Sequence, residues 1–302
     1  MNRPPKISLM TPNFNCADYL EHTIVSVLAQ NYPNLEYIVL DGGSTDASVD
    51  IIRKYEDRLA YWASRPDKGP YATINEGFAR STGDIMAWLN SDDMYLPGAF
   101  STVAEIFAQN PEVEWLTTIM PAAWNEQGQA VLVGDLHGFN RDSFVRGGNG
   151  PSSKDQGYKV YTRGCIQQES TFWRRSLWER AGGYLDTSVT LAADYELWAR
   201  FYQHAELYGV RALLGGYRLR TNQITDQLAK EYREQCRVVL QRYGGKPYGK
   251  AQAWLRRRVA RTIYPALKRM PGATSLGVLF PAKVWVHSGR GGSWELTTKL
   301  MI

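Results

Sequence analysis

Residues 7–46 read ISLMTPNFNCADYLEHTIVSVLAQNYPNLEYIVLDGGSTD, and this stretch decides the fold class. The apolar run 7–10 is typical of a short buried strand, and the apolar residues of 20–28 recur at helical spacing. A second apolar run, 35–40, is followed by the turn sequence Asp-Gly-Gly at 41–43. A strand, a helix and a second strand in succession predict one βαβ unit of a parallel sheet.

The same alternation continues along the first half of the chain. We expect helices over 44–55, 70–80 and 97–107, and strands over 85–89 and 114–119. Residues 120–165, rich in Gly, Ser, Asn and charge, indicate an irregular insertion. Further helices are expected over 171–181, 193–204, 228–243 and 251–270. This order predicts an α/β fold with a mostly parallel central sheet and helices on both faces.

Composition limits the class of protein. Hydrophobic residues make up 44% of the 302 residues, which is enough for a packed core. The cysteines, Cys16, Cys165 and Cys236, have no metal-ligand spacing and no disulfide pattern, so a reducing setting is expected. Residues 1–12, MNRPPKISLMTP, do not have the apolar segment of a signal peptide, and no apolar run approaches the roughly 20 residues that span a bilayer. We therefore expect a cytoplasmic protein.

Charge divides the chain into two predicted regions. Residues 228–302 hold 15 Lys or Arg against three Asp or Glu, whereas residues 1–227 are net acidic. We expect one large α/β domain over 1–227, with halves 1–119 and 120–227, and a basic helical extension over 228–302. Within 251–286, arginines beside an apolar helical face favour binding to an anionic membrane surface. A helical subdomain packed on the core is the alternative, and no nucleic-acid fold signature is present.

Polar clusters follow three of the predicted strands. They are Thr11–Asn15, Asp41–Asp46 and Asn90–Asp93. Ligands of open parallel sheets bind beyond the carboxyl ends of the strands, so these clusters are expected to form one site. An ordinary turn followed by a helix cap is the alternative for each cluster.

Two of the clusters and one further acid have residue types suited to chemistry. Asp41 can accept hydrogen bonds from a base or a ribose, and the adjacent glycines allow a ligand to approach the backbone. Asp92 and Asp93 repel each other unless a cation, such as Mg²⁺ or Mn²⁺, or several hydrogen-bond donors offset their charge. Asp194 begins an amphipathic helix and can act as a general base. The alternative is an N-cap or first-turn acid that the helix dipole favours.

The residues resemble a known family. The stretch 7–46 is similar to the opening of family 2 glycosyltransferases, which have the GT-A fold. The similarity continues through RPDKGPYATINEGFARSTGDIMAWLNSDDMYLPGAF (65–100), CIQQESTFWRRSLWERAGGYLD (165–186) and AADYELWARF (192–201). It covers roughly residues 5–224 in the family's order, and it is strongest to the bacterial branch that builds O-antigen and other surface polysaccharides.

The resemblance implies a role for each matching position. The nucleotide of a sugar donor, expected to be a UDP-sugar, would contact Thr11, Pro12, Asn13, Asn15, Asp41, Gly43, Ser44, Lys68, Asn75 and Asp92. Asp93 would bind the Mn²⁺ or Mg²⁺ ion on the diphosphate, and Asp194 would be the catalytic base. Gln168, Glu169 and Trp173 would face the acceptor or the transferred sugar. Arg218 and Arg220 would close over the diphosphate, with an ordinary surface strand as the alternative.

Two departures from the family pattern refine the expected activity. The Gln-x-x-Arg-Trp motif of processive members is absent, which favours transfer of a single sugar. Ala193 precedes Asp194, where many relatives carry Glu. An inverting, metal-dependent transfer to a lipid-linked glycan at the inner face of the cytoplasmic membrane is the expected reaction. A nucleotidyltransferase and a non-catalytic module that binds nucleotide sugars remain the alternatives.

Overall fold

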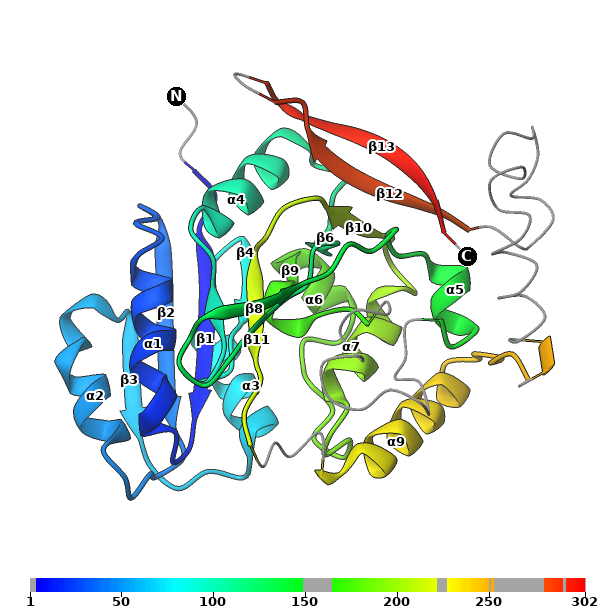
Figure 1. The fold of residues 1–302 in the computed structure, drawn as a ribbon. Coiled ribbons are helices and arrows are strands. Elements are labelled where there is room, and N and C mark those ends of the chain that lie inside the picture. Colours follow the sequence, from blue (N-terminus) through cyan, green and yellow to red (C-terminus); the bar gives the residue numbers. More distant parts are fainter. Residues whose placement is uncertain are drawn as a thin grey trace.

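The computed structural model describes residues 4–148, 165–221, 227–249, 251–252, 280–289 and 292–301 (Figure 1). A nine-stranded sheet with the order β13-β12-β10-β6-β9-β4-β1-β2-β3 forms its centre. Only β9 and β13 run antiparallel to the others, so the expected mostly parallel sheet is confirmed. The strands are β1 (Ile7–Asn13), β2 (Leu35–Asp41), β3 (Tyr61–Ser64), β4 (Ile85–Trp88), β6 (Trp115–Thr118), β9 (Phe172–Arg174), β10 (Leu207–Val210), β12 (Phe280–His287) and β13 (Trp294–Met301).

Helices cover both faces of the sheet because successive strand residues point to opposite sides. On β1, Leu9 belongs to one apolar cluster and the next residue, Met10, to the other. The cluster around Leu9 is closed by α1 (Ala17–Leu28), α2 (Ser48–Lys54) and α4 (Ala99–Gln109). The cluster around Met10 is closed by α3 (Pro70–Arg80), α6 (Arg175–Arg180), α7 (Ala193–Phe201) and α9 (Ala229–Arg242).

A second sheet lies beyond the end of β4. Its order is β5-β11-β7-β8, and its strands are β5 (Met94–Tyr95), β7 (Ala122–Trp124), β8 (Ala130–Val133) and β11 (Gly215–Arg218). The hairpin β7–β8 and the helix α5 (Arg141–Val145) fall in the predicted irregular insertion, which is therefore partly regular. The helix predicted over 171–181 is also corrected, because its first part is β9, which lies between β4 and β6.

The C-terminal region differs from the expected helical extension. The helix α9 forms as predicted and packs on α7, whereas residues 280–301 form the antiparallel hairpin β12–β13. β12 pairs in parallel with β10, so this hairpin continues the central sheet instead of forming a separate helical unit. The predicted membrane-binding segment 251–286 falls mainly on residues 253–279, which lie outside the described residues. No helix in the described ranges is long and apolar enough to span a bilayer.

Candidate donor and catalytic site

The loops that follow β1 and β2 are tied to each other by hydrogen bonds. The Asn13 side chain donates to Asp41 Oδ1 at 2.7 Å, and the Gly42 N–H donates to the Asn13 carbonyl at 2.8 Å. Asn15 has a left-handed backbone (φ 46°), and its side chain accepts the N–H of Thr45 at 2.8 Å. The first two polar clusters predicted from the sequence therefore form one structural unit at the carboxyl edge of the sheet.

Asp41 is the centre of this unit. It is almost fully buried, and its carboxylate accepts bonds from Asn13, from both the N–H and the hydroxyl of Ser44, from the Gly43 N–H and from the Ser64 hydroxyl. Burial raises the pKa of Asp41, but the hydrogen bonds from Ser44, Ser64 and Asn13 outweigh it and leave the pKa below its usual value. A carboxylate has about four acceptor positions, so a nucleotide base would have to share an oxygen with these internal donors.

Thr11 and Pro12 lie beneath this unit. Both are buried within β1, and Thr11 Oγ1 lies 3.1 Å from the Tyr37 hydroxyl on the neighbouring strand. The prediction that they contact the nucleotide requires an exposed surface. Their side chains are buried and support the loop instead. Phe14, which was not singled out from the sequence, is 62% exposed in the same loop.

Gly42 explains how a third segment reaches these loops. A Cβ atom at Gly42 would lie 2.8 Å from the Asp67 carboxylate and 3.3 Å from the Phe14 ring. The missing side chain therefore allows Asp67 and Phe14 to lie together above the end of β2. Gly43 also needs to be glycine, because its φ of 85° is unfavourable for other residues. Sequence reasoning had singled out only Lys68 and Asn75 in the segment that contains Asp67.

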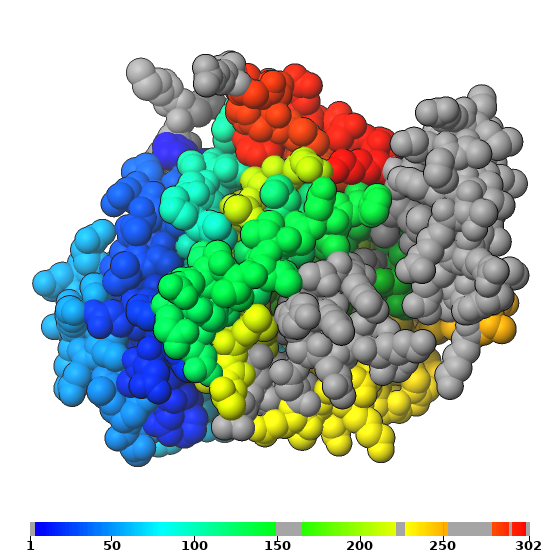
Figure 2. Space-filling view, viewed as in Figure 1, coloured from blue at the N-terminus to red at the C-terminus, as the bar shows by residue number. Residues whose placement is uncertain are grey.

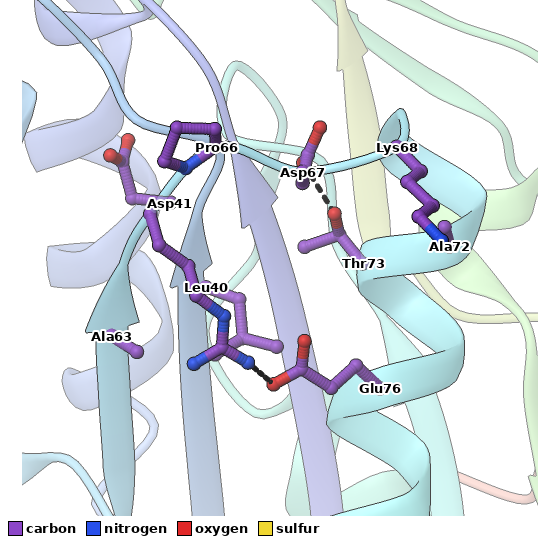
Figure 3. Close-up of a pocket in the computed structure, with 10 residues that line it drawn as sticks. Leu40, Asp41, Ala63, Pro66, Asp67, Lys68, Ala72, Thr73 and Glu76 are labelled. Carbon is purple, nitrogen blue, oxygen red and sulfur yellow. Dashed lines mark hydrogen bonds and ion pairs between the residues drawn. The ribbon is translucent and has the colours of Figure 1, made fainter.

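Beside Asp67, the structure has a hollow of about 270 Å³ between the ends of β2 and β3 and the first turns of α3 (Figure 3). In Figure 3, Asp41, Asp67 and Lys68 lie at its upper end and Glu76 at its lower end. Glu76 forms an ion pair with Arg65, which also lines the hollow. Asp67 accepts hydrogen bonds from the Thr73 hydroxyl and, at 2.8 Å, from the Gly69 N–H. Lys68 is exposed, as its predicted place near the donor requires.

The third polar cluster forms an acidic turn after β4. Asp93 is 1% exposed, whereas Asp92 remains partly accessible and pairs with Arg220 at 3.0 Å. Burial raises the pKa of Asp93 well above its usual value, and the charges of Asp92 and Glu169 raise it further. Burial also raises the pKa of Asp92, against the opposing effect of Arg220. Arg220 therefore lies at the acidic turn, beside the place predicted for the diphosphate.

Arg218 has a different position from the one predicted. Its side chain is fully buried and donates to the carbonyls of Asp92, Asn125 and Glu126. Its backbone N–H donates to Asp93 Oδ1 at 2.9 Å. A guanidinium held by three carbonyls in the interior is not free to close over a ligand. Arg218 instead fixes the acidic turn to β11 and to the β7–β8 hairpin.

The segment before β9 adds a further buried carboxyl group. Gln168 joins the acidic turn to β4, because its side chain donates to the Trp88 carbonyl at 2.6 Å and lies 3.3 Å from the Asn90 amide. Glu169 is 3% exposed, and its Oε1 has no hydrogen-bond partner in the described residues. Burial raises the pKa of Glu169 to about 8, and the charges of Asp194 and Asp92 also raise it.

Trp173 does not face a sugar site. It is fully buried on β9, where its ring lies 5.5 Å from that of Trp88 and 5.9 Å from that of Trp198. These contacts make it a core residue between the sheet and α7. Sequence alone did not separate it from an exposed aromatic residue, because β9 was predicted to be helical.

Asp194 lies in the first turn of α7. Burial raises its pKa to about 6, and its Oδ1 accepts the Tyr195 N–H at 2.8 Å. The Tyr71 hydroxyl of α3 bonds to the backbone of Ala193, which is itself fully buried. A carboxyl group with a pKa near neutrality suits proton abstraction at physiological pH.

Asn75 reaches the same region from α3 but does not line the donor hollow. Its side-chain amide and carbonyl bond to the carbonyl and the N–H of Leu185, at 2.9 and 2.7 Å. Both polar groups are therefore used to hold the loop before α7. The predicted contact of Asn75 with the donor is replaced by this link between α3 and the loop that precedes Asp194.

The donor set of the acidic turn fits a divalent cation. Carboxylate oxygens are preferred ligands of Mg²⁺ and Mn²⁺, and buried like charges at Asp92, Asp93 and Glu169 would be relieved by a cation. No group of three or more His, Cys, Asp or Glu in the described ranges has the geometry to hold a metal alone. A cation here would therefore depend on one or two carboxylates together with oxygens of a bound substrate.

Comparison with known proteins identifies the family. The family model described as Glycosyl transferase family 2 matches residues 8–129. An uncharacterized glycosyltransferase of Mycobacterium tuberculosis is 32% identical over 217 residues, which cover 71% of this chain and 75% of that protein. The chain is a family 2 glycosyltransferase. Membership of this family indicates a glycosyltransferase and not a nucleotidyltransferase.

Two further relatives of this glycosyltransferase have more specific names. TuaG of Bacillus subtilis, named for teichuronic acid biosynthesis, is 26% identical over 74% of this chain and 83% of its own length. A Campylobacter jejuni enzyme is 34% identical over 33% of this chain and 34% of its own length. That enzyme is named GalNAc(5)-diNAcBac-PP-undecaprenol beta-1,3-glucosyltransferase.

Solved structures show that the glycosyltransferase has the GT-A fold. TarS from S. aureus in complex with UDP-GlcNAc aligns with a TM-score of 0.55 and 15% identity, covering 89% of this chain and 77% of that chain. PcManGT, a mannosyltransferase from Pyrobaculum calidifontis in complex with GDP-Man and Mn²⁺, aligns with a TM-score of 0.53 and 16% identity. The latter alignment covers 91% of this chain and 79% of that chain.

Proposed function

We propose that this glycosyltransferase moves one sugar from a nucleotide-sugar donor, expected to be a UDP-sugar, to a hydroxyl group of a lipid-linked glycan, with inversion. The observation that carries the proposal is how three parts are linked. The Asp41 loop with its hollow and the acidic turn Asp92–Asp93 follow β2 and β4, the two neighbours of β1. The third part, Asp194 with its raised pKa, is linked to the acidic turn through Glu169, whose pKa is raised by burial and by the charges of both Asp194 and Asp92. Surface-polysaccharide synthesis is the proposed setting, which the name of TuaG supports.

The nucleotide would bind over the joined loops of β1 and β2. The exposed ring of Phe14 offers a surface for stacking, and the exposed Asp67 carboxylate beside it can accept an N–H of the base. Asp41 would act mainly by holding the loop in shape, through its bonds to Asn13 and Ser44. Lys68 and Arg220 are the cationic groups available for the diphosphate, in place of Arg218.

Asp93 would hold the divalent cation, with Asp92 beside it. When bound, the cation would offset the negative charge of the diphosphate leaving group. The N–H of Arg218 fixes one oxygen of Asp93. Among the described residues, the other oxygen, Oδ2, has the Asn90 amide as its partner, at 3.5 Å. Mn²⁺ and Mg²⁺ both suit these oxygen ligands.

Asp194 would take the proton of the acceptor hydroxyl. The acceptor oxygen then forms its bond to the anomeric carbon while the bond from that carbon to the diphosphate oxygen breaks on the opposite face. A single displacement of this kind inverts the anomeric centre and needs no covalent enzyme intermediate. Besides burial, the charge of Asp194 raises the pKa of Glu169, so we assign both residues to the same part of the site.

The acceptor and the location at the membrane are proposed together. The undecaprenol-linked acceptor in the name of the Campylobacter relative supports a lipid-linked substrate. A basic C-terminal region, with 15 Lys or Arg against three Asp or Glu in 228–302, would favour the anionic inner face of the cytoplasmic membrane. Binding of the purified chain to anionic but not to neutral vesicles tests this location.

The donor and the site are tested with the purified full chain. Thermal-shift screening of UDP-, GDP- and dTDP-sugars, each with Mn²⁺ or Mg²⁺, identifies the ligand that stabilises the native state. Transfer is then measured by release of nucleoside diphosphate with a lipid-linked acceptor, and NMR of the product gives its anomeric configuration. A retained configuration would contradict the inverting mechanism.

Variants separate the proposed roles. Asp194→Asn should keep donor binding but lose transfer by about 100-fold or more. Asp93→Asn should lose the cation-dependent rise in melting temperature that the sugar donor causes in the wild type. Asp50→Asn, at an exposed ion pair on α2, is the matched control and should change neither property. Full transfer activity in both Asp93→Asn and Asp194→Asn would refute the site.

A further inference from the structure

The outer strand of the C-terminal hairpin is an unusually open edge. β13 is eight residues long and ends the central sheet in the described part of the chain, where it pairs only with β12. The opposite edge strand, β3, has four residues. Natural edge strands are commonly shortened, bulged, charged or interrupted by proline, because their free N–H and C=O groups can pair with another chain. β13 carries two charges, Glu295 and Lys299, which are of opposite sign. β13 contains no proline, and its register with β12 is unbroken over eight pairs.

The ladder determines which residues of β13 point to the free edge. The Trp285 carbonyl accepts the N–H of Arg211 beside β10, so the backbone groups of the preceding residue, Val284, point to β13. Val284 pairs with Thr297. The Ser288 N–H donates to the Ser293 carbonyl, so here too an even-numbered residue bonds to an odd-numbered one. The odd-numbered residues of β13 therefore bond to β12, and the N–H and C=O groups of 294, 296, 298 and 300 point outward.

An antiparallel copy of β13 can pair with these outward groups only in registers that match even-numbered residues. A two-fold axis through Leu296, Thr297 or Thr298 meets this condition. Only the axis through Thr297 places Glu295 opposite Lys299 of the second copy, and it does so twice. The same register places Leu296, which is 45% exposed, opposite Thr298. The charges of the strand are therefore complementary to themselves in one register.

We propose that β13 is a homodimerisation strand, which pairs with β13 of a second copy of this chain about a two-fold axis at Thr297. The two central sheets would join into one continuous sheet across the dimer. Figure 1 shows the hairpin (red) at the top of the molecule, away from α3 at the lower left, and Figure 2 shows the hairpin on the outer surface. The donor hollow lies beside α3, because Ala72, Thr73 and Glu76 line it. The dimer would therefore leave the proposed donor site open.

Oligomeric state is the first test. One strand pair gives a small interface, so sedimentation velocity of the purified full chain should show reversible dimerisation with a dissociation constant in roughly the micromolar range. A chain that stays monomeric up to about 500 µM would overturn the proposal. Cross-strand charges contribute to pairing, so Glu295→Lys and Lys299→Glu should each weaken the dimer about tenfold or more.

The exchange of both charges is the matched control for register. Glu295→Lys combined with Lys299→Glu restores opposite charges across the axis and should recover most of the affinity lost in the single variants. Lys299 also lies near Arg211 and Asp135 in its own chain, so thermal melting of each variant checks that the fold is retained. A dimer that is insensitive to both single variants would place the interface elsewhere and refute the proposal.

Cysteine cross-linking tests the axis independently of affinity. Thr297 would face its own copy in a non-hydrogen-bonded pair with Cα atoms about 4.5 Å apart, within the range of a disulfide. Thr297→Cys should therefore form a covalent dimer on mild oxidation. Thr298→Cys is the control, because its two copies would be more than about 7 Å apart and should not cross-link efficiently. Equal cross-linking of the two variants would exclude this register.

Discussion

The backbone N–H of Arg218 donates a 2.9 Å hydrogen bond to Oδ1 of Asp93, which lies 125 residues earlier in the chain. The Arg218 guanidinium bonds to the Asp92 carbonyl, so one residue of β11 holds both members of the acidic turn. The turn that would bind a cation is thus shaped by the second half of the fold, before any ligand is present.

Loss of the Arg218 side chain should destabilise the protein. Arg218→Ala leaves the carbonyls of Asp92, Asn125 and Glu126 without their buried donor, so the free energy of unfolding should fall by about 3 kcal/mol or more. Urea denaturation measures the change. Arg211→Ala, which removes an exposed ion pair with Asp135, is the control and should cost at most about 1 kcal/mol. Equal effects of the two substitutions would contradict the assigned role.

The raised pKa of Asp194 predicts a pH profile. A general base must be ionised, so kcat/KM should fall as the pH drops below about 6, the pKa set by burial of this carboxyl group. The profile is measured with saturating cation and corrected for stability by melting curves at each pH. Asp194→Asn should retain only weak activity without this acid limb. If Asp194→Asn kept the wild-type kcat/KM and its fall below pH of about 6, another group would be the base.

Glu169 predicts a pH dependence of stability. Its pKa is raised by burial from 4.5 to about 8, so the folded state holds a proton that the unfolded state loses at lower pH. This group therefore favours folding at low pH, and that contribution is lost as the pH rises from about 4.5 to 8. Glu169→Gln should be more stable than the wild type at pH 8, with a smaller difference at pH 5. Parallel stability curves for the two proteins would disprove a raised pKa.

Asn75 predicts a coupling between the donor side and the catalytic helix. Asn75→Asp can still accept the hydrogen bond from the Leu185 N–H. It loses the N–H group that bonds to the Leu185 carbonyl, which should loosen the loop before α7. We expect kcat to fall about tenfold, with donor binding nearly unchanged, because the loop positions Asp194 and does not contact the nucleotide. Isothermal titration with donor, beside transfer assays, separates the two. If Asn75→Asp bound the sugar donor more weakly at a normal kcat, the result would support the predicted contact between Asn75 and the nucleotide.

Local sequence patterns predicted the elements whose partners are close in sequence. The strands β1 and β2, the helix α3 and the three polar strand ends follow from apolar periodicity and turn residues, which act over a few positions. β9 was missed because a three-residue strand has no periodicity, and because it is inserted between strands formed much earlier in the chain. The hairpin β12–β13 was missed for a related reason, since its place in the sheet depends on β10.

The site residues also divide into those that local sequence located and those whose roles depend on distant parts of the chain. Asp41, Asp92 and Asp93 were located by their place after strands, a local property. The roles of Arg218 and Asn75 depend on carbonyls of Asn125, Glu126 and Leu185, and backbone carbonyls carry no signal in the sequence. Asp67 was missed because its position depends on the absence of a side chain at Gly42.

The parallel pairing of β12 with β10 has a consequence for biosynthesis. A ribosome releases β10 about 70 residues before β12, so the part of the chain already made must wait with the edge of β10 unpaired. An expression clone that stops at residue 227 would make that waiting state permanent and remove the Trp285 ring that stacks on Tyr208. We expect such a clone to be recovered mainly in inclusion bodies, although every residue proposed for sugar transfer is present in it.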